Sequence, residues 1–251
     1  MRQNIYDNES FAMQYDKMRK EQKGYNANDL IEIPNFRNLI PNVKGKRVLD
    51  LGCGYGENSR YCIENGALYV LGIDISKHML DIANKENLVN GIEYVNMAME
   101  DISQIDKKFD IVISSLAFHY IKDFKKLMKD IYNLLDENGT LVFSIDHPLR
   151  IASIFEPWME KNYIELNGKW FLLVSDYSRN GLREKKWNGE IVKKYHRNFS
   201  ELINNITDSG LKIDKLLEPL PTEEMIQKVP KYIHQIDRPF FLFVRAVKWK
   251  R

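Results

Sequence analysis

The sequence predicts an α/β fold in which a mostly parallel sheet carries helices on both of its faces. Between residues 47 and 145, apolar runs typical of strands alternate with stretches typical of helices. This pattern is expected where crossover helices join parallel strands. Three glycines between residues 52 and 56 connect the first strand to the first helix, and such a turn lets a ligand approach the backbone closely. We expect one domain over residues 1–251.

The first 40 residues are expected to form two helices. Residues 11–18 place apolar side chains at helical spacing, and residues 28–40 suggest a second helix with Pro34 near its start. Residues 1–40 are consistent with surface helices packed on the sheet. A turn over residues 41–46 then leads into the first strand.

The central part of the chain supplies most of the sheet. We expect strands near residues 47–51, 69–73, 92–96, 109–114 and 139–145, and helices near residues 57–65, 76–87 and 122–135. Gly66 and Gly139 follow the first and the last of these helices, where a glycine commonly ends a helix. Ser76 suits the N-cap of the second helix.

Residues 150–198 predict an antiparallel, β-rich cap inserted after the fifth strand. Asn-Gly dipeptides stand at 167–168, 180–181 and 188–189, and Asn-Gly beside apolar or alternating runs is the strongest short hairpin signal. The aromatic residues of this segment are consistent with a wall of a substrate pocket, with the cap's own core and with a dimer interface. They are Phe155, Trp158, Tyr163, Trp170, Phe171, Tyr177, Trp187 and Tyr195.

The chain after the cap returns to the sheet. Ser200 suits the N-cap of a helix over 201–209, which Gly210 would end. A strand over 211–217, a proline-containing loop with a short helix near 223–228, and a last strand over 240–247 complete the domain.

Two carboxylates beside the glycine turn indicate the kind of ligand. Asp50 stands just before the first glycine, where it would repel a pyrophosphate and attract a cation such as the α-amino group of an amino-acid-like ligand. Asp74 ends the second apolar run, where nucleotide-binding α/β units use an acid about 20 residues on to hold the ribose hydroxyls. S-adenosylmethionine (SAM) has a ribose and an amino-acid part and no pyrophosphate, and it therefore fits.

Five stretches resemble the ordered motifs of class I SAM-dependent methyltransferases of the methyltransferase type 11 kind. They are residues 48–59, 72–76, 97–102, 109–121 and 138–144. The resemblance is good over residues 45–148 and looser in the flanks. It implies a Rossmann-like sheet of seven strands, with the last strand antiparallel and inserted between two others. It also implies SAM as the cofactor, S-adenosylhomocysteine (SAH) as the product, and an enzyme of the methyltransferase class.

The resemblance and the position of each motif predict a cofactor site without a metal. Related methyltransferases use N-terminal helices as a lid over the cofactor, so the resemblance implies a helical lid over residues 1–40 as an equal alternative to surface helices. In that lid, Arg19 is expected at the SAM carboxylate, with Tyr15 as a further contact. Ala98 stands where many relatives carry an acid for the adenine amino group, so Asp101 or backbone groups would serve instead. The full expected set is Tyr15, Arg19, Asp50, Gly52, Cys53, Gly54, Asn58, Asp74, Ile75, Ser76, Met79, Met99, Glu100, Asp101, Ser114, Ser115, Leu116 and Tyr120.

Some of these residues have equally simple structural interpretations. Ser76 would serve as a helix cap alone, Ile75 and Met79 as plain core, and the pair Glu100 and Asp101 as solvated surface charge.

Four residues are candidates for contact with the methyl acceptor. His119 follows the fourth strand and His147 follows the fifth, at the sheet edge where open α/β sheets bind their ligands. His147 would suit a general base, and each histidine would equally suit a structural role. His196 and Arg197 lie where the cap returns to the sheet, and Arg197 would suit an acidic substrate group.

We expect a small-molecule acceptor and in-line SN2 transfer, which mainly requires proximity and alignment. The net charge of +2 gives little case for nucleic acid, although an RNA methyltransferase and a non-catalytic SAM-binding protein remain alternatives. The glycine spacing disfavours a nucleotide dehydrogenase. No signal peptide or apolar run of membrane-spanning length is present, and Cys53 and Cys62 suit a reducing compartment. We therefore expect a cytoplasmic monomer or homodimer with no membrane contact.

Overall fold

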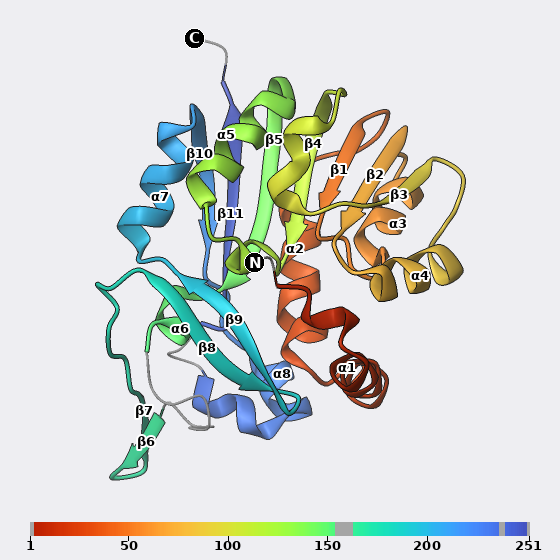
Figure 1. Cartoon of the computed structure of the whole chain (residues 1–251). Helices are drawn as coiled ribbons and strands as arrows, with labels where there is room; N and C mark the ends of the chain where they lie inside the picture. The colour runs from red at the N-terminus through yellow and green to blue at the C-terminus, as the bar shows by residue number, and fades with distance from the viewer. Residues whose placement is uncertain (1–2, 154–162, 236–238, 250–251) are drawn as a thin grey trace.

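The computed structural model describes residues 3–153, 163–235 and 239–249. A seven-stranded sheet lies at its centre, in the order β10-β11-β5-β4-β1-β2-β3 (Figure 1). The strands are β1 Arg47–Leu51, β2 Tyr69–Asp74, β3 Ile92–Asn96, β4 Phe109–Ser115, β5 Leu135–Asp146, β10 Leu211–Leu217 and β11 Phe241–Lys248. The pairs among β1 to β5 are parallel, and β11 is antiparallel to both of its neighbours. The predicted mostly parallel sheet, with its last strand inserted between two others, is confirmed.

Helices cover both faces of this sheet, as predicted. They include α3 Glu57–Glu64, α4 Lys77–Glu86, α5 Phe124–Leu134 and α7 Phe199–Asp208, with the short 3₁₀ helices η3 Met99–Gln104 and η4 Phe118–Tyr120. Alternate residues of β1 enter opposite cores, because successive side chains of a strand point to opposite faces. Leu49 packs with α5 and α7, whereas Val48 packs with the N-terminal helices and α3.

Three predicted helix ends can be compared with the structure. Gly66 follows α3 with φ +92°, in agreement with its expected role. Gly139 does not end a helix: α5 ends at Leu134, and Gly139 lies inside β5, where the pairing with β4 shifts register. Ser200 is not a cap either, because the Asn198 side chain accepts a hydrogen bond from the Glu201 N–H and α7 starts two residues earlier than predicted.

The N-terminal segment is helical, as expected. It contains η1 Ile5–Asp7, α1 Glu9–Glu21, the π-helical turn η2 Asn28–Glu32 and α2 Ile33–Leu39. Pro34 lies in the first turn of α2, where its missing N–H costs no hydrogen bond. Figure 1 shows α1 at the same edge of the sheet as the hairpin formed by β8 and β9.

The cap contains two of the three predicted hairpins. One joins β6 Tyr163–Leu166 to β7 Lys169–Leu172, and the other joins β8 Gly181–Trp187 to β9 Glu190–His196. Their turns are Asn167-Gly168 and Asn188-Gly189, and all four residues have positive φ, as a type I′ turn requires. Asn180-Gly181 is not a hairpin turn. It opens β8, and the Asn180 side chain accepts the Asn198 N–H at 2.8 Å.

Short helices complete the described chain: α6 Pro148–Ile151, α8 Glu223–Lys228 and η5 Pro230–Gln235. In the part of the chain that the structure describes, no helix is both long enough and apolar enough to span a membrane. Two predicted cap aromatics, Phe155 and Trp158, lie outside the described residues.

Candidate active site

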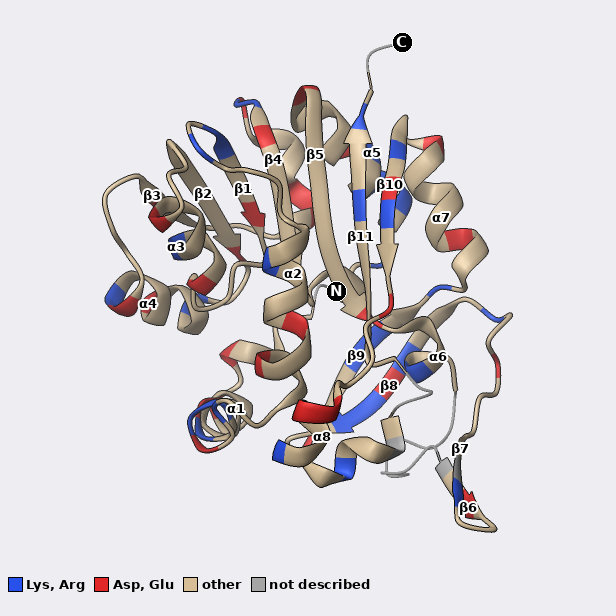
Figure 2. Cartoon of the chain, turned by 180° about the vertical axis from the view of Figure 1, so that it is seen from behind, with Lys and Arg blue, Asp and Glu red and all other residues tan. Residues whose placement is uncertain are grey.

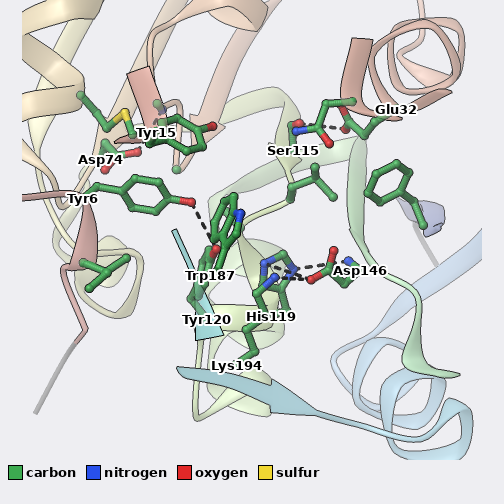
Figure 3. Close-up of a pocket in the computed structure, with 18 of the residues that line it drawn as sticks. Tyr6, Tyr15, Glu32, Asp74, Ser115, His119, Tyr120, Asp146, Trp187 and Lys194 are labelled. Atoms are coloured by element: carbon green, nitrogen blue, oxygen red, sulfur yellow. Dashed lines mark hydrogen bonds and ion pairs between the residues drawn. The ribbon is translucent and has the colours of Figure 1, made fainter. Parts of the chain in front are cut away.

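A cavity of about 580 Å³ lies at the carboxyl ends of the strands, the edge where open α/β sheets bind ligands. Its lining comes from the glycine turn, the ends of β2, β4 and β5, the N-terminal helices and the β8–β9 hairpin. Figure 3 shows Tyr6, Tyr15 and Asp74 on one side of it, and His119, Asp146 and Lys194 farther along. The cavity thus has a first end at the glycine turn and a second end under the hairpin.

The glycine turn forms an open cradle at the first end. Gly52 and Gly54 have φ values of +69° and +54°, a region that residues with a Cβ atom rarely adopt. A Cβ atom on Gly54 would meet no atom within 4 Å, although Gly54 lines the cavity. The backbone is therefore bare at the place where a ligand would lie against it. Cys53 and Asn58 line the cavity beside it, as predicted.

Asp50 and Asp74 both line this end, where the sequence places them. Burial raises the pKa of Asp50 to about 7, although the Ser59 hydroxyl donates to it at 2.7 Å. Burial also raises the pKa of Asp74, whose two oxygens accept the N–H groups of Gly54 at 2.9 Å and Ser76 at 2.8 Å. Two carboxylates held out of water would gain from a ligand that brings a cation and hydroxyl donors.

The N-terminal helix α1 contributes Tyr15 and Arg19, two of the predicted cofactor residues, to the cavity lining. Arg19 pairs with Glu57 at 2.7 Å and more distantly with Asp29 at 3.5 Å. Burial raises the pKa of Tyr15 to about 12, so its hydroxyl stays protonated at neutral pH. Arg19 therefore keeps its guanidinium at the first end of the cavity, within reach of a ligand carboxylate.

Residues after β2 and β3 form the more apolar wall of the first end. Ile75, Met79, Met99 and Glu100 line the cavity. Asp101, which follows Glu100 in η3, is not among the lining residues. The structure therefore does not bring Asp101 into the cavity lining, which leaves backbone groups as the predicted partners of the adenine amino group.

Ser76 acts as the N-cap of α4 and does not line the cavity. Its hydroxyl accepts the Met79 N–H at 3.1 Å and donates to Asp7 at 2.6 Å. Asp7 also accepts the His78 N–H at 3.1 Å. Sequence reasoning missed Asp7, which anchors the N-terminal segment to the start of α4.

The carboxyl end of β4 and the residues that follow it contribute to the lining of the cavity. Ser115, Leu116 and Tyr120 line it as predicted, whereas Ser114 is buried and donates to the Leu51 carbonyl at 2.8 Å. Leu116 has a φ of +51°. Such a conformation costs energy for a residue with a side chain, and residues of this kind gather at functional sites.

Glu32 is a buried carboxylate of the cavity that the sequence analysis did not single out. Its side chain lines the cavity, and the residue is 1% exposed. It accepts hydrogen bonds from the Ser115 hydroxyl at 2.8 Å and the Ser144 hydroxyl at 2.5 Å, and burial raises its pKa. The only local signal was one acid within an apolar run, and such an acid commonly lies on a solvated face.

His119 is the one predicted acceptor residue that lines the cavity among the described side chains. Its Nε2 lies 3.9 Å from Asp146 Oδ2, and Asp146 also forms an ion pair with Lys194 of β9 (Figure 3). Burial lowers the pKa of His119 to about 3, so the ring is neutral at physiological pH and a weak base. Lys194 was not predicted, and it holds the pKa of Asp146 below its usual range despite the burial of that carboxyl.

The other three candidates lie away from the cavity. His147 Nδ1 accepts the Leu149 N–H and so caps α6, which leaves the ring proton on Nε2, and Nε2 donates to Glu218 at 2.6 Å. His196 contacts the Tyr177 carbonyl at 2.8 Å, and Arg197 donates to the carbonyls of Ile121 and Lys122. These contacts join the cap to the sheet and turn the side chains away from the cavity lining.

An aromatic cluster joins the N-terminal helix to the tip of the hairpin. Trp187 packs edge to face against Phe11 and Tyr15, with ring centroids 5.4 and 5.7 Å apart. The hydroxyls of Tyr6 and Tyr120 lie 3.2 Å apart below it. Of the cap aromatics, Trp187 therefore lines the cavity, whereas Phe171 is 47% exposed.

Comparison with known proteins gives the family. The family model of a methyltransferase domain matches residues 49–143. A crystal structure of an S-adenosylmethionine-dependent methyltransferase from Mesorhizobium loti is similar at 33% identity and a TM-score of 0.78, over 86% of this chain and 97% of that one. An uncharacterized protein of Haemophilus influenzae is 32% identical over 97% of this chain and 96% of its own length. The chain belongs to the SAM-dependent methyltransferase family, and its cofactor is SAM.

Proposed function

We propose that this protein transfers a methyl group to a small organic molecule that binds under the β8–β9 hairpin. The observation that carries the proposal is the single cavity that runs from the glycine turn to the hairpin. Its volume of about 580 Å³ lies within the usual range of about 300–1,000 Å³ for small-molecule sites. Side chains of α1 and of the hairpin meet over it, which suits a small ligand better than a polymer.

The residues of the first end fit SAM. Asp50 would pair with its ammonium group, Asp74 with its ribose hydroxyls and Arg19 with its carboxylate, while the bare backbone at Gly54 admits it closely. Bound SAM supplies a methyl group activated on a sulfonium, whose C–S bond breaks with its electron pair going to sulfur as the acceptor's lone pair forms the new bond.

The protein's own groups at the second end position the acceptor and exclude water. The rings of Tyr6, Tyr15 and Trp187 pack against one another at the cavity and cover it. In this proposal, residues 1–40 act as the lid and residues 150–198 as the cap. Asp146 is engaged by Lys194, and His119 is a weak base. Glu32 is therefore the carboxylate at this end that we assign to take a proton from an acceptor that retains one.

Two measurements in sequence test the proposal. Thermal unfolding with SAH, and with NAD as the control, should show stabilisation by SAH alone, by roughly 2.7 kcal/mol at 100 times its dissociation constant. Incubation with methyl-labelled SAM and cell extract split into small-molecule, RNA and protein fractions should then label the small-molecule fraction. Label in the RNA would support the nucleic-acid alternative, and SAH binding without label anywhere would support a non-catalytic SAM-binding protein.

A cytoplasmic location and a monomeric or homodimeric state remain predictions. Cell fractionation tests the location, and light scattering of the purified protein tests the oligomeric state.

A further inference from the structure

The second end of the cavity is rich in positive charge. Lys185 and Lys186 of β8, Lys194 of β9 and Arg150 of α6 line it, and Figure 2 shows Lys and Arg along both strands of the hairpin. The carboxylates that line the same end are Asp146 and Glu32. Among the described residues, two acids therefore face four cations at this end of the cavity.

Neither acid is available to Lys185. Asp146 forms its ion pair with Lys194. Glu32 accepts hydrogen bonds from the hydroxyls of Ser115 and Ser144 and forms no ion pair with Lys185 among the described residues. Lys185 itself donates to the Ser153 carbonyl at 2.9 Å, and among the described residues no carboxylate lies within ion-pair distance of it.

Lys185 is nevertheless held in this position by the hairpin. Along β8, Arg183, Lys185 and Trp187 share the inward face, while Glu184 and Lys186 are exposed. Burial lowers the pKa of Lys185, and the charges of Arg183 and Lys194 lower it further. A half-buried ammonium with like charges beside it is unfavourable unless an anion joins it.

Apolar side chains complete this end of the cavity. Ile151, Leu172, Phe241 and Trp187 are among the residues that line the cavity with Lys185. A ligand that satisfies the site therefore needs one anionic group and an apolar body.

We propose that the methyl acceptor is an organic anion, with a carboxylate or phosphate group that pairs with Lys185 and an apolar body that packs against Trp187. The inference rests on the proposed function, because it concerns the acceptor of that reaction. The anionic group is the recognition handle, and its charge-assisted hydrogen bond to the ammonium is stronger than a neutral one.

Three matched probes test the charge alone. 2-Naphthoate, 2-naphthyl phosphate and 2-naphthamide share one apolar body, and their binding to SAH-saturated protein is measured by calorimetry. We expect at least one acid to bind about tenfold or more tightly than the amide, since a hydrogen bond to a charged group contributes about 1.5–3 kcal/mol. The acid that binds more tightly identifies the anionic group as a carboxylate or a phosphate.

Variants on the two faces of the hairpin provide the controls. Lys185→Met should remove the preference for the acid, and Lys185→Arg should retain most of it. Lys193→Met removes the same charge from the opposite face, where the Lys193 side chain is 51% exposed and pairs with Glu184 at 3.7 Å. It should leave the preference unchanged.

The outcomes separate this inference from the proposed function. Failure to bind SAH, measured first, would refute the proposed function. Normal SAH binding together with no acid binding, with equal affinity for acid and amide, or with an acid preference that survives Lys185→Met would overturn the anionic acceptor alone.

Discussion

Gly54→Ala tests the assignment of the glycine turn as part of the cofactor-binding site. The residue has a φ of +54°, and an added Cβ atom would meet no protein atom within 4 Å. The substitution therefore costs backbone strain of about 1–2 kcal/mol, partly offset by about 0.4–1 kcal/mol from the lower entropy of the unfolded chain. We expect a net loss of about 1 kcal/mol in the free energy of unfolding, which for a chain of this length lowers Tm by roughly 2–4 °C.

The effect on the cofactor should be larger than the effect on the fold. The new methyl group would occupy cavity space at the place where the ligand approaches the backbone. Overpacking of a close contact costs about 1–3 kcal/mol, which corresponds to an SAH affinity weaker by roughly 5- to 150-fold. Calorimetric titration with SAH measures this loss directly.

Gly45→Ala is the matched control. Gly45 has a φ of +70°, and a Cβ atom there also meets nothing within 4 Å, but Gly45 is not among the residues that line the cavity. Both variants should lose similar stability, and only Gly54→Ala should lose SAH affinity. Equal SAH affinity in the two variants would refute the view that the bare backbone at Gly54 receives the cofactor.

Three further predictions concern the acids and the aromatic closure. Folded Asp50 keeps its proton to about pH 7, whereas the unfolded residue loses it near pH 4, so its contribution to the free energy of unfolding falls as pH rises through that window. SAH affinity should rise over the same window, because pairing with an ammonium needs the carboxylate, and Asp50→Asn should flatten both profiles in calorimetry and thermal unfolding. Asp74→Asn should weaken SAH binding by about tenfold or more, and unchanged affinity in calorimetry would refute the assignment of Asp74 to the ribose. Asp74→Ala is a poorer variant, because the N–H groups of Gly54 and Ser76 would lose their hydrogen-bond acceptor. Trp187→Ala removes two ring contacts, each worth about 0.5–1.5 kcal/mol, and should speed SAH dissociation in stopped-flow measurements. Trp249→Ala, at a residue that is 62% exposed, should leave the dissociation rate unchanged. Equal rates for the two variants would show that the aromatic cluster does not retain the cofactor.

The first end of the cavity was predictable because its residues follow strands that are easily recognised. Asp50 and Asp74 stand at the ends of apolar runs, and parallel strands bring their carboxyl ends to one edge. Glycines with positive φ and the two Asn-Gly turns follow from local backbone preferences. None of these features depends on how distant segments pack.

The second end depends on such packing. Glu32 meets Ser144, 112 residues away, and Lys194 meets Asp146, 48 residues away. His147 is drawn to Glu218, 71 residues away, although it stands at the correct sheet edge. Residue type and spacing carry no information about these encounters.

The sequence by itself determined the sheet and the cofactor, and it placed the glycine turn to which we assign that cofactor, because period, glycine conformation and strand ends are local properties. Only the tertiary structure decided which histidines line the cavity, and that Lys185 lines it with no carboxylate of the described residues within ion-pair distance. The reason is that a hairpin's alternation defines two faces, whereas the docking of the hairpin on the sheet decides which face meets the ligand.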